Sequence, residues 1–275
     1  MSGLCSEYRE LYSIKTCQRG RPTALSLSPT GRWLCSASDY GYLLIQRASR
    51  DYIYCHVRMD RSNHVTAVVW ATDLQIILGC FNGVVYVATL ITNPAPDEDR
   101  IKIRGLISDI VSPVRALAYD GDRKMIALGY RGLVSIWRWA TVWEMVDIFA
   151  TKIGGILAGV NSLHFFGADK ILLLGLDSGV MIWRGRGELG PVNLGLRVCR
   201  IGAAAVSSDS SFMAISTLDR SIFIWPLSPQ GPTASLTRQY SLESGHEWHK
   251  FEPYTPVAVT SDLCVVCGTL DGTIV

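Results

Sequence analysis

The sequence repeats one short pattern six times, a turn residue that stands between two β-rich runs. Successive turn residues are 43, 49, 46, 42 and 52 positions apart along the chain. A period in the forties, with several short strands in each copy, is typical of a β-propeller, in which every copy forms one four-stranded blade. The turn residues of copies one to six are Asp39, Asn82, Arg131, Asp177, Asp219 and Asp271.

Residues around this turn fall into columns that support the repeat. A small residue stands two positions before the turn residue, where we expect one blade to pack closely on the next. These small residues are Ala37, Cys80, Gly129, Gly175, Thr217 and Thr269. Apolar residues stand three and five positions after the turn, and positions two apart share one face of a strand, so that face is predicted to be buried. The residues three positions after the turn are Tyr42, Val85, Val134, Val180, Ile222 and Ile274.

Further β-rich runs before and after each turn make every copy read as an antiparallel meander. In copy one, "ALSLS" and "RWLCSAS" are joined by Ser28-Pro29-Thr30-Gly31, whose residues suit a type I turn. The runs "DYIYCHVRM" and "RIKIRGLIS" predict outer strands. The sequence therefore predicts an all-β chain, a β-propeller of four-stranded antiparallel blades in residues 16–275, with six repeats visible and the sixth blade incomplete.

The segment from Val142 to Phe149 fits this scheme by position but not by pattern. Its apolar residues stand at 142, 145, 146 and 149, a spacing typical of a helix. The same segment falls where copy three needs its outer strand. We give the position in the repeat more weight and predict a strand.

Three tryptophans stand six positions after the turn residue, in copies three, four and five, as Trp137, Trp183 and Trp225. Together with the run "SPTGRWLCSASDYGYLLI", they make the chain resemble the WD-repeat (WD40) propellers over almost its whole length. The resemblance implies a structural role for these tryptophans. In that family the Trp joins a hydrogen-bonded tetrad with a turn Asp, a His before the innermost strand and a Ser or Thr on the second strand.

The tetrad is incomplete in every copy of this sequence. Copy five has Thr217, Asp219 and Trp225 but no His, and copy six has His246, Thr269 and Asp271 but no Trp. The residues after the three tryptophans are Arg138, Arg184 and Pro226 rather than Asp. These departures leave no subfamily to assign, whereas the fold prediction depends on the period and the columns.

Copy six stops at Val275, and Arg9 to Lys15 reads as an outer strand without inner strands of its own. In WD-repeat propellers the N-terminal strand commonly completes the last blade, which removes an open sheet edge. We therefore expect residues 1–15 to supply an outer strand. Two arrangements stay open, a six-bladed ring closed by that strand or a truncated seven-bladed ring.

Charge and hydropathy argue against nucleic acid or a bilayer as partner. The net charge of +2 comes from 26 basic and 24 acidic residues spread along the chain, whereas binders of nucleic acid or anionic lipid concentrate basic residues. The longest uncharged run, Ile153 to Ala168, is too short and too polar to span a membrane. Glu7, Arg9 and Glu10 interrupt the place of a signal-peptide core, which predicts an intracellular chain, cytoplasmic or nuclear.

Gly185, Gly187 and Gly190 have the G-x-G-x-x-G spacing of dinucleotide-binding loops. Such a loop needs a helix that begins at its last glycine, so that backbone amides face the pyrophosphate. Pro191 follows instead, and no helical pattern comes after it. We therefore predict a connection between strands and no cofactor.

Other candidate chemistry in the sequence is weak. Cys264 and Cys267 form C-x-x-C within a strand-like run, where positions three apart point to opposite faces, so we expect structural thiols. His246 and His249 stand three apart in a polar stretch, but a catalytic zinc normally needs three protein ligands. No nucleophile elbow or phosphate loop occurs. The sequence predicts neither a metal site nor an enzyme.

The best-supported activity is protein binding at one face of the blades. The turns between second and third strands and the loops that enter the innermost strands open on that face, which WD-repeat proteins characteristically use for docking. The candidate protein-binding residues there are Tyr40, Phe81, Arg115, Tyr130, Arg131 and Arg220, and aromatic residues and Arg are enriched in binding hot spots. We predict a non-enzymatic scaffold that binds other proteins or peptides. The alternatives are a peripheral phosphoinositide-binding propeller, although the double-arginine motif of such propellers is missing, and a propeller enzyme without a recognisable motif.

Overall fold

The computed structural model describes residues 14–15, 20–48, 53–92, 100–153, 156–166, 170–175, 179–184, 189–192, 201–207, 209–217, 221–228, 231–232, 238–241, 257–259, 265–267 and 273–274. These residues form β-strands joined by turns, with one short 3-10 helix, η1 (Arg61–Asn63), and no α-helix in the described part of the chain. The chain divides into two compact units. The N-terminal unit is Gln18–Ala150, and the C-terminal unit combines Met1–Cys17 with Thr151–Val275.

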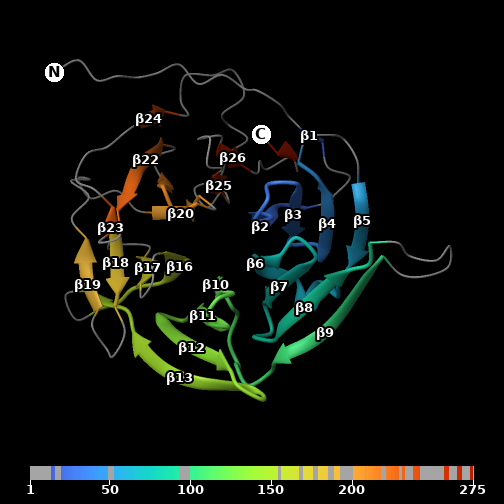
Figure 1. The fold of residues 1–275 in the computed structure, drawn as a ribbon, viewed down its shortest axis with the longest axis horizontal. Coiled ribbons are helices and arrows are strands. Elements are labelled where there is room, and N and C mark those ends of the chain that lie inside the picture. Colours follow the sequence, from blue (N-terminus) through green and yellow to red (C-terminus); the bar gives the residue numbers. More distant parts are fainter. Residues whose placement is uncertain are drawn as a thin grey trace. The chain divides into compact units, whose positions relative to one another are not determined.

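Three four-stranded antiparallel sheets follow one another in the N-terminal unit (Figure 1). Blade one contains β2 (Pro22–Leu27), β3 (Trp33–Ser38), β4 (Tyr42–Arg47) and β5 (Ile53–Arg58). Blade two contains β6 (Val65–Thr72), β7 (Gln75–Cys80), β8 (Val85–Leu90) and β9 (Ile101–Ile107). Blade three contains β10 (Ala116–Asp120), β11 (Met125–Tyr130), β12 (Leu133–Trp139) and β13 (Trp143–Ala150). The innermost strand β6 contacts both β2 and β10, which is the blade arrangement of a β-propeller.

The C-terminal unit contains one further four-stranded sheet and one five-stranded sheet. Blade four contains β16 (Val160–Phe166), β17 (Lys170–Gly175), β18 (Gly179–Trp183) and β19 (Leu189–Val192). Blade five contains β20 (Ile201–Val206), β21 (Phe212–Thr217) and β22 (Ser221–Ser228), and β22 pairs with both β23 (Gly231–Pro232) and β24 (Arg238–Ser241). The innermost strands β16 and β20 contact each other.

Three short two-stranded pairings complete the C-terminal unit. They are β14 (Lys152–Ile153) with β15 (Ile156–Leu157), β25 (Val257–Val259) with β26 (Val265–Cys267), and β1 (Ile14–Lys15) with β27 (Thr273–Ile274). In the last pair, Ile14 lies opposite Ile274 and Lys15 opposite Thr273. This pair therefore joins residues near the two ends of the sequence.

The predicted antiparallel blades are confirmed in copies one to four, where each sheet has four strands in chain order. The described strands of copy five form a five-stranded sheet instead. The segment with helical spacing, Val142 to Phe149, lies almost entirely in β13, so the prediction from its repeat position is confirmed.

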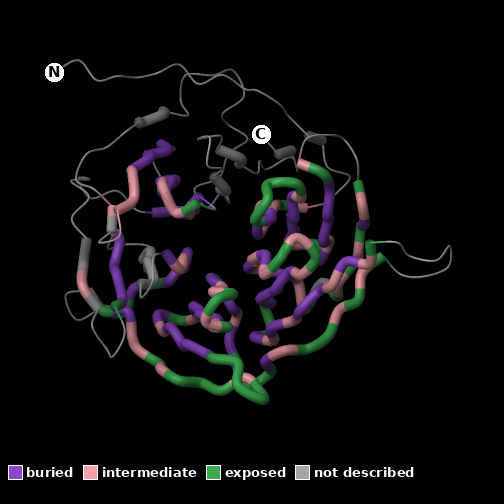
Figure 2. Tube along the Cα trace, viewed as in Figure 1, coloured by how far each residue is buried: buried purple, intermediate pink, exposed green. Residues whose placement is uncertain are grey.

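Buried apolar residues line the third strand of each blade (Figure 2). Val85, Val134, Val180 and Ile222 are buried as predicted. In copy one the buried residue is Leu43, whereas Tyr42 is only half-buried. In copy one, the predicted column of buried residues three positions after the turn was therefore wrong by one residue.

The hydrogen bonds within the turns show why the predicted column is displaced by one residue in copy one. Gly41 donates its amide to the Ser38 carbonyl, and Gly83 donates its amide to the Cys80 carbonyl in the same way. Tyr40 therefore corresponds to Asn82 in the fold, and Asp39 stands one residue earlier. The run from Leu43 to Ile45 is buried throughout, so it lacks the alternation by which a register can be recognised.

A β-bulge recurs at the second residue of the innermost strands in four blades. The register shifts lie between Pro22 and Ala24, Val65 and Ala67, Val160 and Ser162, and Ile201 and Ala203. The bulge leaves one residue unpaired within its own sheet and re-aims its side chain. In three blades that side chain donates to a carbonyl of the next blade: Thr23 to Val65 at 2.6 Å, Thr66 to Val114, and Asn161 to Ile201 at 2.8 Å.

Close packing between blades requires small residues on the second strand, as predicted. In blade two the small residue at the closely packed position is Gly79, one residue before Cys80, which the repeat column predicted. A Cβ atom on Gly79 would lie 2.6 Å from Cγ1 of Val114 in blade three. Ala37, at the corresponding position of blade one, is fully buried.

Candidate interaction surface

The turns between second and third strands and the segments that enter the innermost strands lie at one end of the blades in the N-terminal unit. Backbone hydrogen bonds join them: Asp39 donates to Arg21, Met59 to Gly41, Phe81 to His64, Val114 to Cys80 and Arg115 to Gly129. We call this surface the turn face. Its candidate residues are Tyr40, His64, Phe81, Val111, Arg115, Tyr130 and Arg131.

In blade one the turn face is formed by Asp39 and Tyr40. The Asp39 carboxylate accepts the Arg21 amide at 2.8 Å, which ties the turn to the segment that enters β2. Tyr40 follows with 42% of its surface exposed. Gly41 has a φ of 81°, and its backbone packs against the Met59 carbonyl. The exposed part of this turn is therefore the Tyr40 side chain.

In blade two an aromatic pair forms the turn face. The His64 ring stacks on Phe81 with centroids 5.0 Å apart and an interplanar angle of 23°. Phe81 nevertheless keeps 49% of its surface exposed. Asn82 accepts the Val84 amide through its side chain, a bond that Asn commonly makes in turns. The stack and the bonded turn hold Phe81 in one orientation.

In blade three the turn is one residue shorter than in blades one and two. Tyr130 pairs with Leu133, so only Arg131 and Gly132 form the loop. Their φ angles are 46° and 73°, which identifies the two-residue hairpin turn that Asn-Gly normally occupies. Arg131 is exposed in this left-handed conformation, whereas Tyr130 beside it is half-buried.

Arg115 occupies the position in blade three that the bulge residues Thr23 and Thr66 occupy in blades one and two. It directly precedes β10, and its side chain is exposed. Val111, in the segment that enters this strand, exposes 95% of its surface. Blade three therefore contributes two arginines and an isolated apolar side chain to the turn face.

Five of the six predicted protein-binding residues thus lie on the turn face, and Arg220 lies outside the described residues. The same holds for the turn residues Asp177, Asp219 and Asp271, for Gly185 and Gly187, for His246 and His249, and for Cys264. Gly190 lies in β19, opposite Ile182 of β18. The last glycine of the G-x-G-x-x-G pattern therefore lies within a strand and does not begin a helix.

The three repeat tryptophans are buried in the third strands of their blades. Trp137 donates its indole N–H to the Ser135 hydroxyl at 2.9 Å, a residue of its own strand. Trp225 is fully buried and stacks on Phe223, with centroids 5.7 Å apart. Thr217 donates its hydroxyl to the Ser221 carbonyl. The bond of Trp137 thus differs from the one that the WD-repeat resemblance implies.

Burial makes the described thiols poor nucleophiles. It raises the pKa of Cys55 to about 11 and that of Cys80 to about 12, and it raises the pKa of Cys35 as well. All three cysteines are free. Within the described ranges, no group of three or more His, Cys, Asp or Glu residues is placed to hold a metal ion. No helix in the described part is long and apolar enough to cross a membrane.

No protein-family model matches the chain, and no curated protein matches it. The likeness to WD repeats therefore stays a resemblance in sequence pattern and blade architecture.

Sequence reasoning missed two features of the turn face. The His64–Phe81 stack joins residues 17 positions apart that meet only because a turn and a strand entrance are neighbours. The left-handed Arg131 had a partial signal, since Arg-Gly between two apolar runs has the length of a two-residue hairpin loop. The alignment of the repeats obscured this signal, because it placed Arg131 in a column that otherwise contains only Asp and Asn.

Proposed function

We propose that this chain is a non-enzymatic scaffold that binds segments of other proteins at the turn face. The observation that supports this most directly is the series of exposed Tyr40, Phe81 and Arg131 on three consecutive blades. Tyr and Phe provide large contact areas with few flexible bonds, and Arg provides a large contact area with several hydrogen-bond donors. A surface of this composition suits a peptide better than a small polar substrate.

Arg131 is the residue that links the turn face to binding most directly. A left-handed conformation costs an L-residue roughly 1–2 kcal/mol, and Gly or Asn reduces that cost. Arg has no acceptor with which to bond the turn amides, unlike Asp39 and Asn82. Its presence in an exposed turn is therefore not explained by stability, and we assign it to binding.

The partner chemistry follows from the side chains available. Arg115 and Arg131 offer forked donors that suit carboxylates, and Phe81 on His64 offers a fixed aromatic surface. We propose an acidic segment with an aromatic residue as the ligand. The intracellular location predicted from the sequence is part of the same proposal.

The test is selection of peptides from a random library on the full-length chain. Selected peptides should be rich in Asp, Glu and aromatic residues. Arg131→Asn suits the turn and should leave stability equal or slightly higher, while it weakens binding at least about tenfold, roughly 1.4 kcal/mol. Arg138→Asn is the matched control, because Arg138 is also exposed but lies near the other end of β12.

Unchanged binding by the Arg131 variant would place the docking surface elsewhere. Loss of folding in that variant would make Arg131 structural. Binding to anionic vesicles in place of peptides would favour the phosphoinositide alternative.

We also propose that the sixth copy forms a further blade. This is supported by the pairing of β25 with β26 and of β27 with β1, at the positions where copy six needs strands. In this proposal the N-terminal strand completes the last blade.

A further inference from the structure

A second surface, away from the turn face, lies along β13 at the outer side of the N-terminal unit (Figure 2). Five of the eleven exposed large hydrophobic residues among those described fall within residues 139–148. They are Trp139, Val142, Met145, Val146 and Ile148. A group of exposed apolar residues marks an interaction site more often than a single exposed apolar residue does.

β13 is the outermost strand of its sheet among the described strands. This strand is the last of its sheet and pairs only with β12 among the described strands. Eight residues of extended chain span roughly 26 Å. The last strand of a sheet can accept another extended segment, which adds a strand to the sheet.

A bulge separates the apolar and acidic side chains of this strand. Met145 lies opposite Trp137 and Asp147 lies opposite Ile136, so Val146 is the extra residue. Directly opposed residues share a face of the sheet. Met145 and Ile148 therefore share the face of Trp137 and Ser135, and Glu144 and Asp147 share the opposite face with Arg138 and Ile136.

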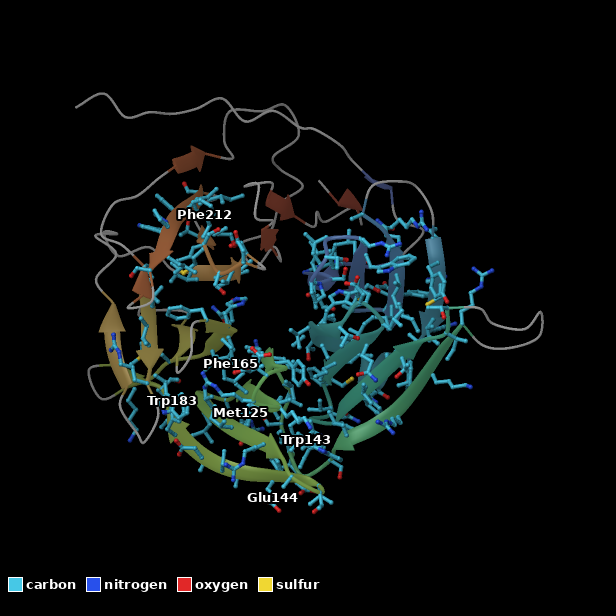
Figure 3. All side chains as sticks on the ribbon, viewed as in Figure 1. Met125, Trp143, Glu144, Phe165, Trp183 and Phe212 are labelled. Carbon is cyan, nitrogen blue, oxygen red and sulfur yellow. The ribbon has the colours of Figure 1, made fainter. Side chains whose placement is uncertain are left out.

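The face of β13 that carries Met145 and Ile148 lies on the side of the sheet that blade two partly covers. Trp137 and Trp143 pack in the core formed with residues of blade two, such as Ile107. Met145 and Ile148 continue the same face toward the rim and stay 51% and 48% exposed. Figure 3 marks Trp143 and Glu144 on this outer strand. The core of blades two and three thus continues into an uncovered apolar strip.

The other outer strands of the unit carry exposed basic side chains, whereas the charged residues of β13 are the acidic Glu144 and Asp147. Arg58 is exposed on β5, and Lys102 and Arg104 are exposed on β9. Charged side chains, Lys above all, discourage pairing at a sheet edge. β13 has no basic residue and exposes aliphatic side chains, so it is the outer strand in this unit that is suited to pairing.

We infer that β13 docks an extended segment of a partner protein in which aliphatic and basic residues alternate. Its aliphatic side chains cover Met145 and Ile148, and its Lys or Arg side chains face Glu144 and Asp147. A second copy of this chain fits less well, because antiparallel self-pairing would oppose the acidic faces and like charges destabilise a pair. The site goes beyond the proposed turn-face function and does not depend on it.

The test uses the full chain and a labelled octapeptide of alternating valine and lysine. Fluorescence anisotropy should detect binding that Glu144→Lys and Met145→Ser each weaken about tenfold. Asp122→Lys is the matched control, since Asp122 is an exposed acidic residue in the turn between β10 and β11. Thermal melts followed by circular dichroism establish that each variant is folded, and Ile148→Ser repeats the test should Met145→Ser unfold.

Three comparisons separate strand addition from other contacts. An octapeptide N-methylated at alternate residues along its pairing edge keeps its side chains but should lose binding. A valine–glutamate octapeptide should bind the Glu144→Lys variant better than the unaltered chain. The Arg131→Asn variant should bind the valine–lysine peptide normally.

Equal binding of the two charge patterns, or unchanged binding after Glu144→Lys, would overturn the proposal. Concentration-dependent dimerisation that Met145→Ser abolishes would identify a second copy as the occupant and would overturn it too.

Discussion

The indole Nε1 of Trp70 donates a hydrogen bond to the Ser26 carbonyl across 3.0 Å and so joins the innermost strands of blades two and one. Trp70 is 5% exposed and belongs to the apolar core shared by these blades. The residue thus combines burial with one directed bond. Trp70 does not belong to a repeated column of the sequence, because the other copies have no Trp at the end of the innermost strand.

Trp70→Phe should lower the free energy of unfolding by about 1–2 kcal/mol, because the aromatic core is largely kept while the Ser26 carbonyl loses its donor. Trp70→Ala should cost about 3–5 kcal/mol through the cavity. Urea unfolding followed by fluorescence measures both. Trp139→Phe, at an exposed position, is the control and should change stability by less than about 0.5 kcal/mol. Equal effects of Trp70→Phe and Trp139→Phe would mean that the inter-blade bond contributes nothing.

Gly83→Ala should destabilise the chain by about 3 kcal/mol or more. Gly83 has a φ of 88°, and a Cβ atom there would overlap the Ile110 carbonyl oxygen. The turn of blade two would have to move away from the segment that enters blade three. Gly105→Ala is the matched control, because a Cβ on Gly105 meets nothing within 4 Å. Thermal melts of the two variants should differ clearly, and similar melts would contradict the close packing of this turn.

Much of the blade architecture could be predicted because period and alternation are properties of the sequence itself. The outer strand at Val142 to Phe149 is the clearest case, since repeat position was right where local spacing pointed to a helix. The spacing arose from the bulge at Val146, which moves the apolar residues out of strict alternation.

Other features depend on contacts that no local pattern encodes. At three of the four bulges, the side chain of Thr23, Thr66 or Asn161 reaches a carbonyl of the next blade, some 40 residues away or more along the sequence. The column of copy one was misplaced because Tyr40, and not Asp39, corresponds to Asn82 in the turn, a match that the hydrogen bonds of the fold define. On the turn face the residue types could be predicted, but the His64–Phe81 stack and the left-handed Arg131 depend on how turns and strand entrances meet.

His164 should make the chain less stable in mild acid. Its Nε2 lies 2.9 Å from the Ala204 carbonyl, and burial lowers its pKa from 6.5 to about 4. Between these values the unfolded chain binds a proton that the folded chain does not, so stability falls as pH drops from 6.5 to 4, by on the order of 3 kcal/mol.

His164→Gln keeps an N–H donor but does not titrate. Urea midpoints of the original chain and this variant should therefore converge as pH falls from 7 to 4, because only the original loses this contribution. Parallel pH profiles would show that His164 is as easily protonated in the folded state as in the unfolded state.

Deletion of residues 1–15 should lower the melting temperature and promote aggregation. The deletion removes β1, whose Ile14 and Lys15 pair with Ile274 and Thr273 of β27. If β1 completes the last blade, its loss exposes a sheet edge that can template intermolecular pairing, and the lost ladder bonds cost about 1–2 kcal/mol. Deletion of residues 1–8 is the matched control, because it leaves β1 in place. Ile14→Pro should reproduce part of the effect, since proline cannot donate to the ladder. Light scattering and thermal melts report the two effects, and closure by the N-terminal strand is rejected if the longer deletion changes neither.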